Sequence, residues 1–268
     1  MYPNREVFAS APLALVAAEI RFTDAARLRQ QATLDEVTIA LEDRFPFAES
    51  LNQTDLNFGS TASPQVQHRA GLVLQDATST SSLTLMSNAL TYETTAYSEF
   101  SDLVDAVTAA CRALVEANVR PAIQRIGLRY LDEIRVPDQI TDGREWVRWI
   151  DHRLLAHLAV GPVDVPVTAT QGITTYDLGN RRGLNFQYAA LNQGPVVAPR
   201  YLRREAFPAG PFFVLDFDGY QDFTGDAPTA LNAEVVGACL AAVHTPAGAA
   251  FQRSITDDAR ALFRGGLI

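Results

Sequence analysis

A strand-like pattern occurs twice in this chain of 268 residues, and this repeat constrains the fold more than any other feature of the sequence. Residues 13–22 end in the alternation Ile20-Arg21-Phe22, and the run Leu128-Arg129-Tyr130 echoes it in the second half. Successive side chains in a β-strand point to opposite faces, so alternation of apolar and charged residues predicts a strand. The echo therefore predicts two copies of one folding unit in tandem.

Helix-start signals lie at almost the same offset behind the two strands. Thr33 with Glu36, and Asp142 with Glu145, have the spacing of a capping box, in which two side chains satisfy free N–H groups at a helix start. Apolar residues follow each box at helical spacing; they are Leu34, Val37, Leu41 and Phe45 in the first half, and Val147, Ile150, Leu154 and Leu158 in the second. We therefore expect a helix after each strand, the first ending before Pro46.

The remainder of each half predicts further strands and a helical end. In the first half, the polar stretch 47–66 predicts a loop, and apolar alternation predicts strands around 72–74, 83–85 and 90–97. The clearest helical period of the chain begins at Phe100 and stops near Asn118. The second half predicts strands near 163–177, 183–191 and 211–218, a helix that opens at Asp226 and Pro228, a restart at Thr245-Pro246 and a stop at Gly265-Gly266.

This order predicts an α+β fold made by tandem duplication of a β-α-β-β-β-α unit. The first half spans residues 1–120 and the second spans residues 121–268, with an extra loop at 192–210. We expect the two halves to form one compact unit. The order resembles the topology of the TATA-binding protein, which implies an antiparallel sheet covered on one face by helices.

Three segments together resemble a bacterial family of unknown activity that is described as sporadically distributed. They are Pro12-Leu13 through Glu19-Ile20-Arg21-Phe22, the central Arg125-Ile126-Gly127-Leu128-Arg129-Tyr130, and Phe251 through Ile255-Thr256-Asp257. Their order and spacing extend the resemblance over nearly the whole chain. The resemblance implies one unit of family length, and it carries no catalytic residue over to this sequence.

Composition and charge indicate a cytoplasmic protein that does not enter membranes. The sequence has no run of about 18 uncharged apolar residues, and its first residues lack the pattern of a signal peptide. The formal net charge of -9 repels phosphate backbones unless positive charge is concentrated locally. No Gly-rich phosphate loop and no zinc-spaced cluster of Cys and His occurs, so the sequence predicts no cofactor.

Two carboxylates on one predicted strand are the candidate metal ligands. Asp216 and Asp218 alternate with Phe213, Leu215 and Phe217, so both carboxylates point to the face opposite the aromatic and aliphatic side chains. Such a pair could hold a divalent cation that assists chemistry on a phosphorylated substrate. The polar face of a half-solvated strand has the same pattern.

Arginines concentrate around the extra loop, next to an aromatic residue. The candidate binding residues are Arg181, Arg182, Arg200, Tyr201, Arg203 and Arg204. Guanidinium groups beside an aromatic ring suit phosphate or carboxylate recognition, and loops often carry binding functions. The alternative is that these arginines pair with carboxylates of the same chain.

Arg125 and Arg129 share one face of the central strand and form the last candidate binding set. On a face covered by helices they need carboxylate partners, for which Glu19, Asp132 or Glu133 are candidates. On an open face they mark a polar binding surface.

Taken together, these features predict a non-enzymatic binding or regulatory protein that engages another protein through the open sheet face or the arginine-rich loop. The alternatives are a metal-assisted enzyme centred on Asp216 and Asp218, and nucleic-acid binding through the arginine-rich loop. A cavity between sheet and helix that takes an apolar ligand is a further alternative. The sequence does not fix the oligomeric state.

Overall fold

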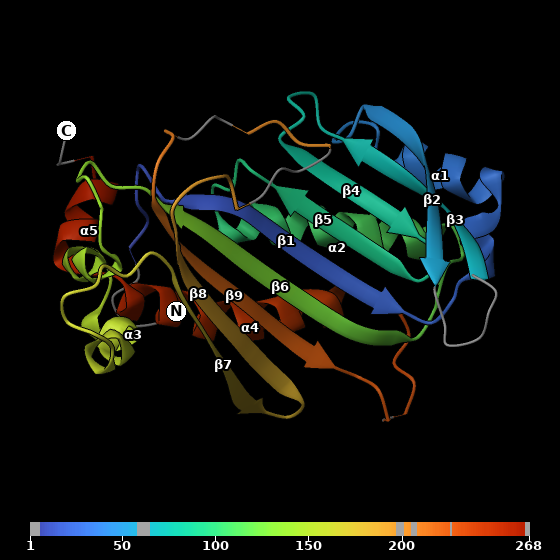
Figure 1. The fold of residues 1–268 in the computed structure, drawn as a ribbon. Helices are drawn as coiled ribbons and strands as arrows, with labels where there is room; N and C mark the ends of the chain where they lie inside the picture. Colours follow the sequence, from blue (N-terminus) through green and yellow to red (C-terminus); the bar gives the residue numbers. More distant parts are fainter. Residues whose placement is uncertain (1–5, 58–64, 197–200, 205–207, 226, 266–268) are drawn as a thin grey trace.

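One antiparallel sheet of nine strands organises the molecule (Figure 1). The computed structural model describes residues 6–57, 65–196, 201–204, 208–225 and 227–265. The strands are β1 (Leu13–Phe22), β2 (Phe47–Asn57), β3 (Gln65–Gln75), β4 (Ser81–Met86), β5 (Ala89–Thr94), β6 (Ile123–Ile134), β7 (Thr170–Gly179), β8 (Arg182–Leu191) and β9 (Phe212–Asp222). Their order across the sheet is β2-β3-β4-β5-β1-β6-β9-β8-β7, so the two strands that echo each other in sequence pair at its centre.

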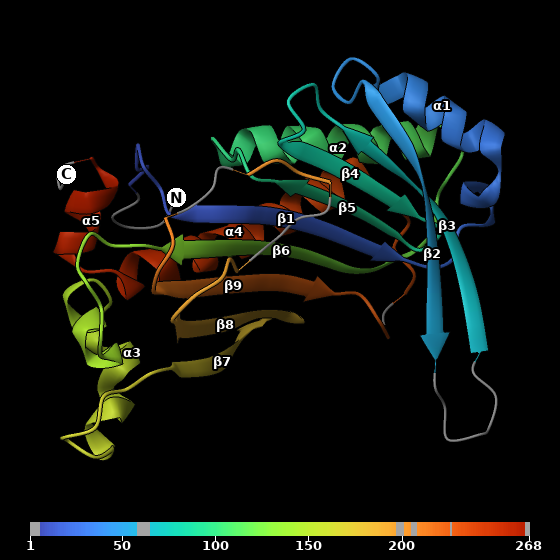
Figure 2. The same ribbon diagram turned by 45° about the horizontal axis from the view of Figure 1, so that its top comes forward.

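The longer helices lie on one face of the sheet, as Figure 2 shows. They are α1 (Gln31–Leu41), α2 (Phe100–Glu116) and α4 (Ala233–Ser254). The shorter helices are η1 (Ala26–Arg29), η2 (Gly143–Arg148), α3 (His152–Leu155), η3 (Ala156–Val160) and α5 (Asp257–Phe263). Leu103, Val107 and Leu114 form a buried stripe of α2 at helical spacing, which confirms the helix predicted there. The α+β class is therefore confirmed.

No helix among the described residues covers the centre of the opposite face of the sheet, which is called the open face below (Figure 1). On β6 the side chains of Ile126, Leu128 and Tyr130 are buried beneath the helices. The intervening Arg125 and Arg129 point to the open face because side chains alternate along a strand.

A short piece of the predicted extra loop crosses one end of the open face. Leu202 packs there with Leu15, Leu131, Phe212 and Val214 in a second, smaller apolar cluster. The described part of the loop therefore covers one end of the open face.

The prediction of a loop at 47–66 is wrong, because β2 and β3 pair there as a long hairpin. Phe47 pairs with Gln75 at one end of the hairpin and Asn57 with Gln65 at the other. Backbone hydrogen bonds between the strands stabilise a sequence that lacks the apolar alternation by which strands are recognised. Each half was predicted to contribute four strands, and this hairpin gives the first half a fifth.

The two predicted capping boxes have different outcomes. Thr33 lies inside α1, and the residue that precedes the helix, Gln30, makes no side-chain capping bond. The box of Asp142 and Glu145 forms as predicted, but it opens the 3-10 helix η2 instead of a continuous α-helix. The tighter turn changes which residues face inward, so Val147 is 51% exposed while Trp146 and Trp149 are buried.

The long C-terminal helix also starts and ends differently from its prediction. Asn232 caps α4 by accepting hydrogen bonds from the N–H groups of Glu234 and Val235, so the helix does not open at Asp226, which lies outside the described residues. The predicted restart at Pro246 is wrong, since α4 continues through that residue. Packing of α4 against β6, β8, β9 and α2 offsets the one backbone hydrogen bond that proline removes.

By length and composition, α4 is the one helix among the described residues that could cross a membrane. Val236, Leu240 and Val243 of this helix are buried in the main core. This face of the helix packs in the protein core.

Candidate functional site

The arginines predicted on the central strand contact the two carboxylates predicted as metal ligands. Arg129 donates from Nε and Nη2 to the two Asp216 oxygens at 2.8 and 2.6 Å. Arg125 donates to Asp218 at 3.2 Å, and Asn185 donates to the same oxygen at 3.3 Å. Antiparallel pairing of β6 with β9 places these side chains side by side on the open face.

A cation at Asp216 and Asp218 would have to displace these arginines. In the part of the chain that the structure describes, no group of three or more His, Cys, Asp and Glu side chains is placed to hold a metal ion. The hydrogen bond to Asp216, the largest contribution, raises the pKa of Arg129. The arrangement is therefore that of a sheet surface with compensated charge.

The carboxylates proposed as partners of Arg125 and Arg129 have other contacts. Glu19 accepts a hydrogen bond from Arg21 at 2.8 Å. Glu133 accepts from Arg135 at 2.8 Å and from Arg204 at 2.6 Å, and its side chain is fully buried. Arg125 and Arg129 thus form ion pairs with Asp218 and Asp216 and not with the predicted carboxylates. The register between β6 and β9 brings these side chains together.

The arginine-rich set does not gather into one cluster. Arg181 donates to the carbonyl of Thr224, and Arg182 donates to that of Gly179, both near the turn between β7 and β8. Arg203 and Arg204 lie toward the other end of β9, where Arg204 contacts Glu133. Arg200 lies outside the described residues.

Segment 201–204 is attached to the sheet through its backbone. The Tyr201 carbonyl accepts a hydrogen bond from Gln75, and the Arg203 N–H donates to the Ser79 carbonyl at 2.6 Å. Thr95 donates to the Arg203 carbonyl at 2.6 Å. These bonds give the segment a structural role as a cover for one end of the open face.

A groove of about 720 Å³ runs along the open face beside the edge strand β7. Polar and apolar side chains line it together, among them Arg129, Glu93, Gln187, Ile173 and Val214. Burial raises the pKa of Glu93. The groove is thus mixed in character and lies over the centre of the sheet.

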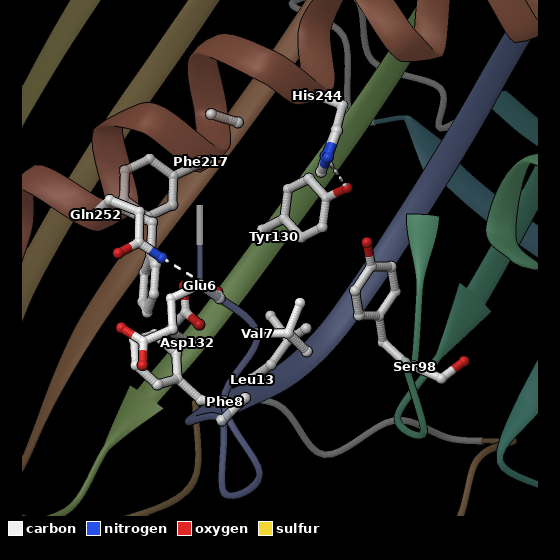
Figure 3. A pocket seen from close by; sticks show the side chains of 15 residues that line it. Glu6, Val7, Phe8, Leu13, Ser98, Tyr130, Asp132, Phe217, His244 and Gln252 are labelled. Carbon is white, nitrogen blue, oxygen red and sulfur yellow. Dashed lines mark hydrogen bonds between the residues drawn. The ribbon is translucent and has the colours of Figure 1, made fainter. Parts of the chain in front are cut away.

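A second, smaller pocket lies on the other side of the sheet, under α4 (Figure 3). It has a volume of about 140 Å³ and is called the helix-face pocket below. Strands β6 and β9 form its floor, α4 forms one wall, and the N-terminal segment with Tyr97 and Ser98, which precede α2, completes it. Its apolar lining includes Phe8, Tyr97, Phe217 and Phe251.

Asp132 lines this pocket and is only 4% exposed. Across the described ranges of the chain, its carboxyl group makes no hydrogen bond and no ion pair. Burial raises the pKa of Asp132 well above its usual value, and the negative charge of Asp216 raises it further. Both effects favour the protonated form of the Asp132 carboxyl group.

No family model and no curated protein matches this chain. The functional argument therefore depends on the geometry of the two surfaces.

The remaining polar groups of the helix-face pocket are held by neighbours. The Tyr130 hydroxyl and His244 Nδ1 lie 2.8 Å apart, and the His244 ring stacks on Phe100 at 4.1 Å between centroids. Glu6 contacts Arg264 through both of its oxygens and Arg260 at 4.0 Å. In Figure 3 the Asp132 carboxyl lies toward Glu6 and Phe8, and the pair Tyr130–His244 lies at the other end.

Thiol chemistry has no support in this structure. Cys111 and Cys239 are both free and buried. Burial raises the pKa of the Cys111 thiol to about 12, so it carries almost no thiolate at neutral pH. Both cysteines therefore act as packing residues.

Sequence reasoning considered Asp132 only as a partner for an arginine and missed its place in a pocket. The signal was available in the alternation of β6, where Asp132 has the same parity as Ile126, Leu128 and Tyr130. A charged residue in the buried set of a strand indicates a special environment, because an ionised carboxylate is costly to bury alone.

Proposed function

We propose that this chain is a non-enzymatic binding protein that takes an extended segment of another polypeptide along β7 and the adjoining groove of the open face. The observation that carries the proposal is that β7 forms one edge of the sheet (Figures 1 and 2). Among the described residues no strand pairs with its outer side. An edge strand offers a row of backbone N–H and C=O groups to an added strand.

The sequence of β7 supports strand addition. Its ten residues contain one charge, Asp177, and no proline, so it lacks the common features that prevent pairing at an edge. Ile173 lies on β7, is 66% exposed and lines the groove. An apolar side chain of the added segment could therefore bury Ile173 while the backbones pair.

Charge on the open face favours a polypeptide over a nucleic acid. Arg21, Arg125 and Arg129 each contact a carboxylate of the same face. Phosphate binding would have to break these pairs, on a chain whose net charge is -9. A polypeptide offers both charges as well as apolar side chains, which matches the mixed lining of the groove.

We also propose that the two halves are copies of one unit with the topology of the TATA-binding protein. In each half the first strand is central, the last strand lies beside it, and the earlier strands follow outward. Each half then continues into a long helix, α2 or α4, and these two helices contact each other. Glu19 and Gly127, which correspond in the sequence echo, pair directly across β1 and β6.

Membership of the sporadically distributed bacterial family remains a proposal, supported by the order of the three motifs. Its central motif forms β6, and the closing motif forms the junction between α4 and α5. A cytoplasmic location is likewise a proposal that rests on the sequence.

Selection of peptides from a random decapeptide library against the full chain tests the polypeptide proposal. We expect the selected peptides to bind wild type and to lose binding to Ile173→Asp. Methylation of alternate peptide N–H groups should also abolish binding, because it removes the donors that pair with a strand edge.

Ile39→Asp is the matched control, since Ile39 is also 66% exposed but lies on α1. Peptides that bind Ile173→Asp as well as wild type would overturn the proposal. Native mass spectrometry of the free chain identifies the other occupant of this edge, a second copy of the same chain. A dimer that Ile173→Asp disrupts would replace the proposed partner.

A further inference from the structure

The helix-face pocket combines a buried carboxyl group with a cavity that is open to a ligand. We propose that it binds a small molecule that carries an ammonium group on an apolar body about the size of one benzene ring. The pocket and β7 lie on opposite sides of the sheet, so this inference is independent of polypeptide binding at β7.

The position of Asp132 is the first argument. Nearly all buried polar groups in proteins have a hydrogen-bond partner, and one without a partner requires an explanation. Asp132 is 4% exposed, lines the pocket, and makes no hydrogen bond or ion pair within the described part of the chain. A ligand that donates hydrogen bonds into the pocket would supply what the protein does not.

The local charge favours a cationic donor over a neutral or anionic one. The negative charge of Asp216, on the other face of the sheet, repels a negative charge on Asp132. The nearby Glu6 is also acidic, and the two arginines close to it, Arg260 and Arg264, already contact its carboxylate. His244 faces the pocket from α4 and contacts the Tyr130 hydroxyl. A ligand carboxylate would meet repulsion here, whereas an ammonium group would be attracted.

The apolar lining sets the size and nature of the ligand body. Phe8, Tyr97, Phe217 and Phe251 provide aromatic surface, and aromatic rings also attract cations. The volume of about 140 Å³ is close to that of an engineered cavity of about 150 Å³ that binds benzene. One ring with a short aminomethyl arm therefore matches the pocket.

Binding of such a ligand changes the protonation of Asp132. In the unliganded protein burial and the charge of Asp216 both raise the pKa of Asp132, and so favour the protonated carboxyl group. An ammonium ion brings a positive charge that stabilises the carboxylate, so the carboxyl proton leaves to solvent. No covalent bond of the ligand forms or breaks.

Isothermal titration calorimetry of the full chain with benzylamine, benzyl alcohol and benzoate tests the proposal. The three probes share one ring and differ in charge. We expect benzylamine to bind about 10- to 100-fold more tightly than benzyl alcohol, the range of a hydrogen bond to a charged group. Titrations in buffers of different ionisation enthalpy should show net proton release when benzylamine binds.

Asp132→Asn provides the decisive variant because it keeps the shape of the side chain and removes the charge. We expect it to reduce benzylamine affinity about 10- to 100-fold, to abolish proton release, and to leave the affinity for benzyl alcohol unchanged. Asp258→Asn, an acid on the exposed side of α5, is the matched control and should bind benzylamine like wild type.

Three results would overturn the proposal. They are equal affinity for benzylamine and benzyl alcohol, unchanged benzylamine binding by Asp132→Asn, and absence of benzylamine binding by wild type at millimolar concentration. A thermal melt of Asp132→Asn verifies that the variant is folded. Ile173→Asp should leave benzylamine binding intact, which separates this result from the outcome at β7.

Discussion

Asp132 and Glu133 are neighbours on β6, but the two faces of the sheet give them opposite surroundings. Glu133 points to the open face, where Arg135 and Arg204 contact its carboxylate. Asp132 points to the helix-covered face, where no cation pairs with it within the described residues. Both side chains are buried, so the difference lies in their partners and not in their distance from water.

The comparison separates two ways in which this fold handles buried acids. Burial acts on Glu133 to raise its pKa, but hydrogen bonds from Arg204 and Arg135 outweigh it and lower the pKa overall. Burial of Asp132 raises its pKa without opposition, and Asp216 adds to the effect. On the open face arginines thus compensate the charge of Glu133, as suits the proposed polypeptide site. In the helix-face pocket the charge of Asp132 is left for a ligand to compensate.

Removal of the Glu133 charge should have the largest effect on stability. Arg135 and Arg204 are only 11% and 10% exposed, and Glu133→Gln takes away the counter-charge that both contact. We expect the free energy of unfolding to fall by about 3 kcal/mol, as when one member of a buried ion pair is removed. Urea denaturation at neutral pH measures this change.

Glu19→Gln is the matched control for that experiment. Glu19 and Arg21 are 35% and 54% exposed, so loss of their ion pair should cost less than about 0.5 kcal/mol. If both variants lost the same stability, burial of the Glu133 pair would not be the cause.

Asp216→Asn should have an intermediate effect on stability, and it tests whether the two faces of the sheet are coupled electrostatically. Asp216 is 8% exposed, but its partner Arg129 is 52% exposed and can turn toward water, so we expect a loss of about 1 kcal/mol. The variant should also lower the pKa of Asp132, because it removes the charge that acts through the sheet. A carboxyl NMR titration of the variant measures that pKa. An unchanged pKa would mean that the two faces are electrostatically independent.

The smallest effects should appear in the pH dependence of stability, with opposite signs for the two neighbours. Folded Asp132 keeps a proton that the unfolded chain releases, so its contribution weakens as pH rises above the ordinary value of 3.8. Folded Glu133 has a lowered pKa, so its contribution is present above the ordinary value of 4.5 and is lost as pH falls through the folded pKa.

Denaturation of wild type, Asp132→Asn and Glu133→Gln between pH 3 and 7 measures these two slopes. With rising pH, wild type should lose stability relative to Asp132→Asn and gain stability relative to Glu133→Gln. Slopes of the same sign would contradict the opposite surroundings of the two acids.

Local patterns predicted the elements whose residues alternate or repeat clearly. The alternation at Ile20 and Phe22 and the helical period from Phe100 correspond to β1 and α2. The hairpin of β2 and β3 was missed because the polar residues of 47–57 carry no strand period, and pairing with β3 stabilises them. Pro246 led to the wrong prediction of a restart within α4, because tertiary packing outweighs the helix-breaking tendency of one proline.

The site could be predicted only as far as the faces of single strands. Alternation correctly placed Arg125 and Arg129 together, and Asp216 with Asp218, but the contact between these pairs depends on the register of strands far apart in sequence. The helix-face pocket needs α4 and the N-terminal segment to close over β6, which no local pattern encodes. The one sequence signal of the pocket was that Asp132 lies in the buried set of alternating residues on β6.

Titration of the Asp132 carboxyl carbon by ¹³C NMR in the full chain tests the central comparison most directly. Loss of one signal in Asp132→Asn assigns the resonance. We predict that the Asp132 signal titrates with a midpoint well above 3.8 in the free protein, and that benzylamine lowers this midpoint. A midpoint near pH 3.8 in the free protein would contradict the account.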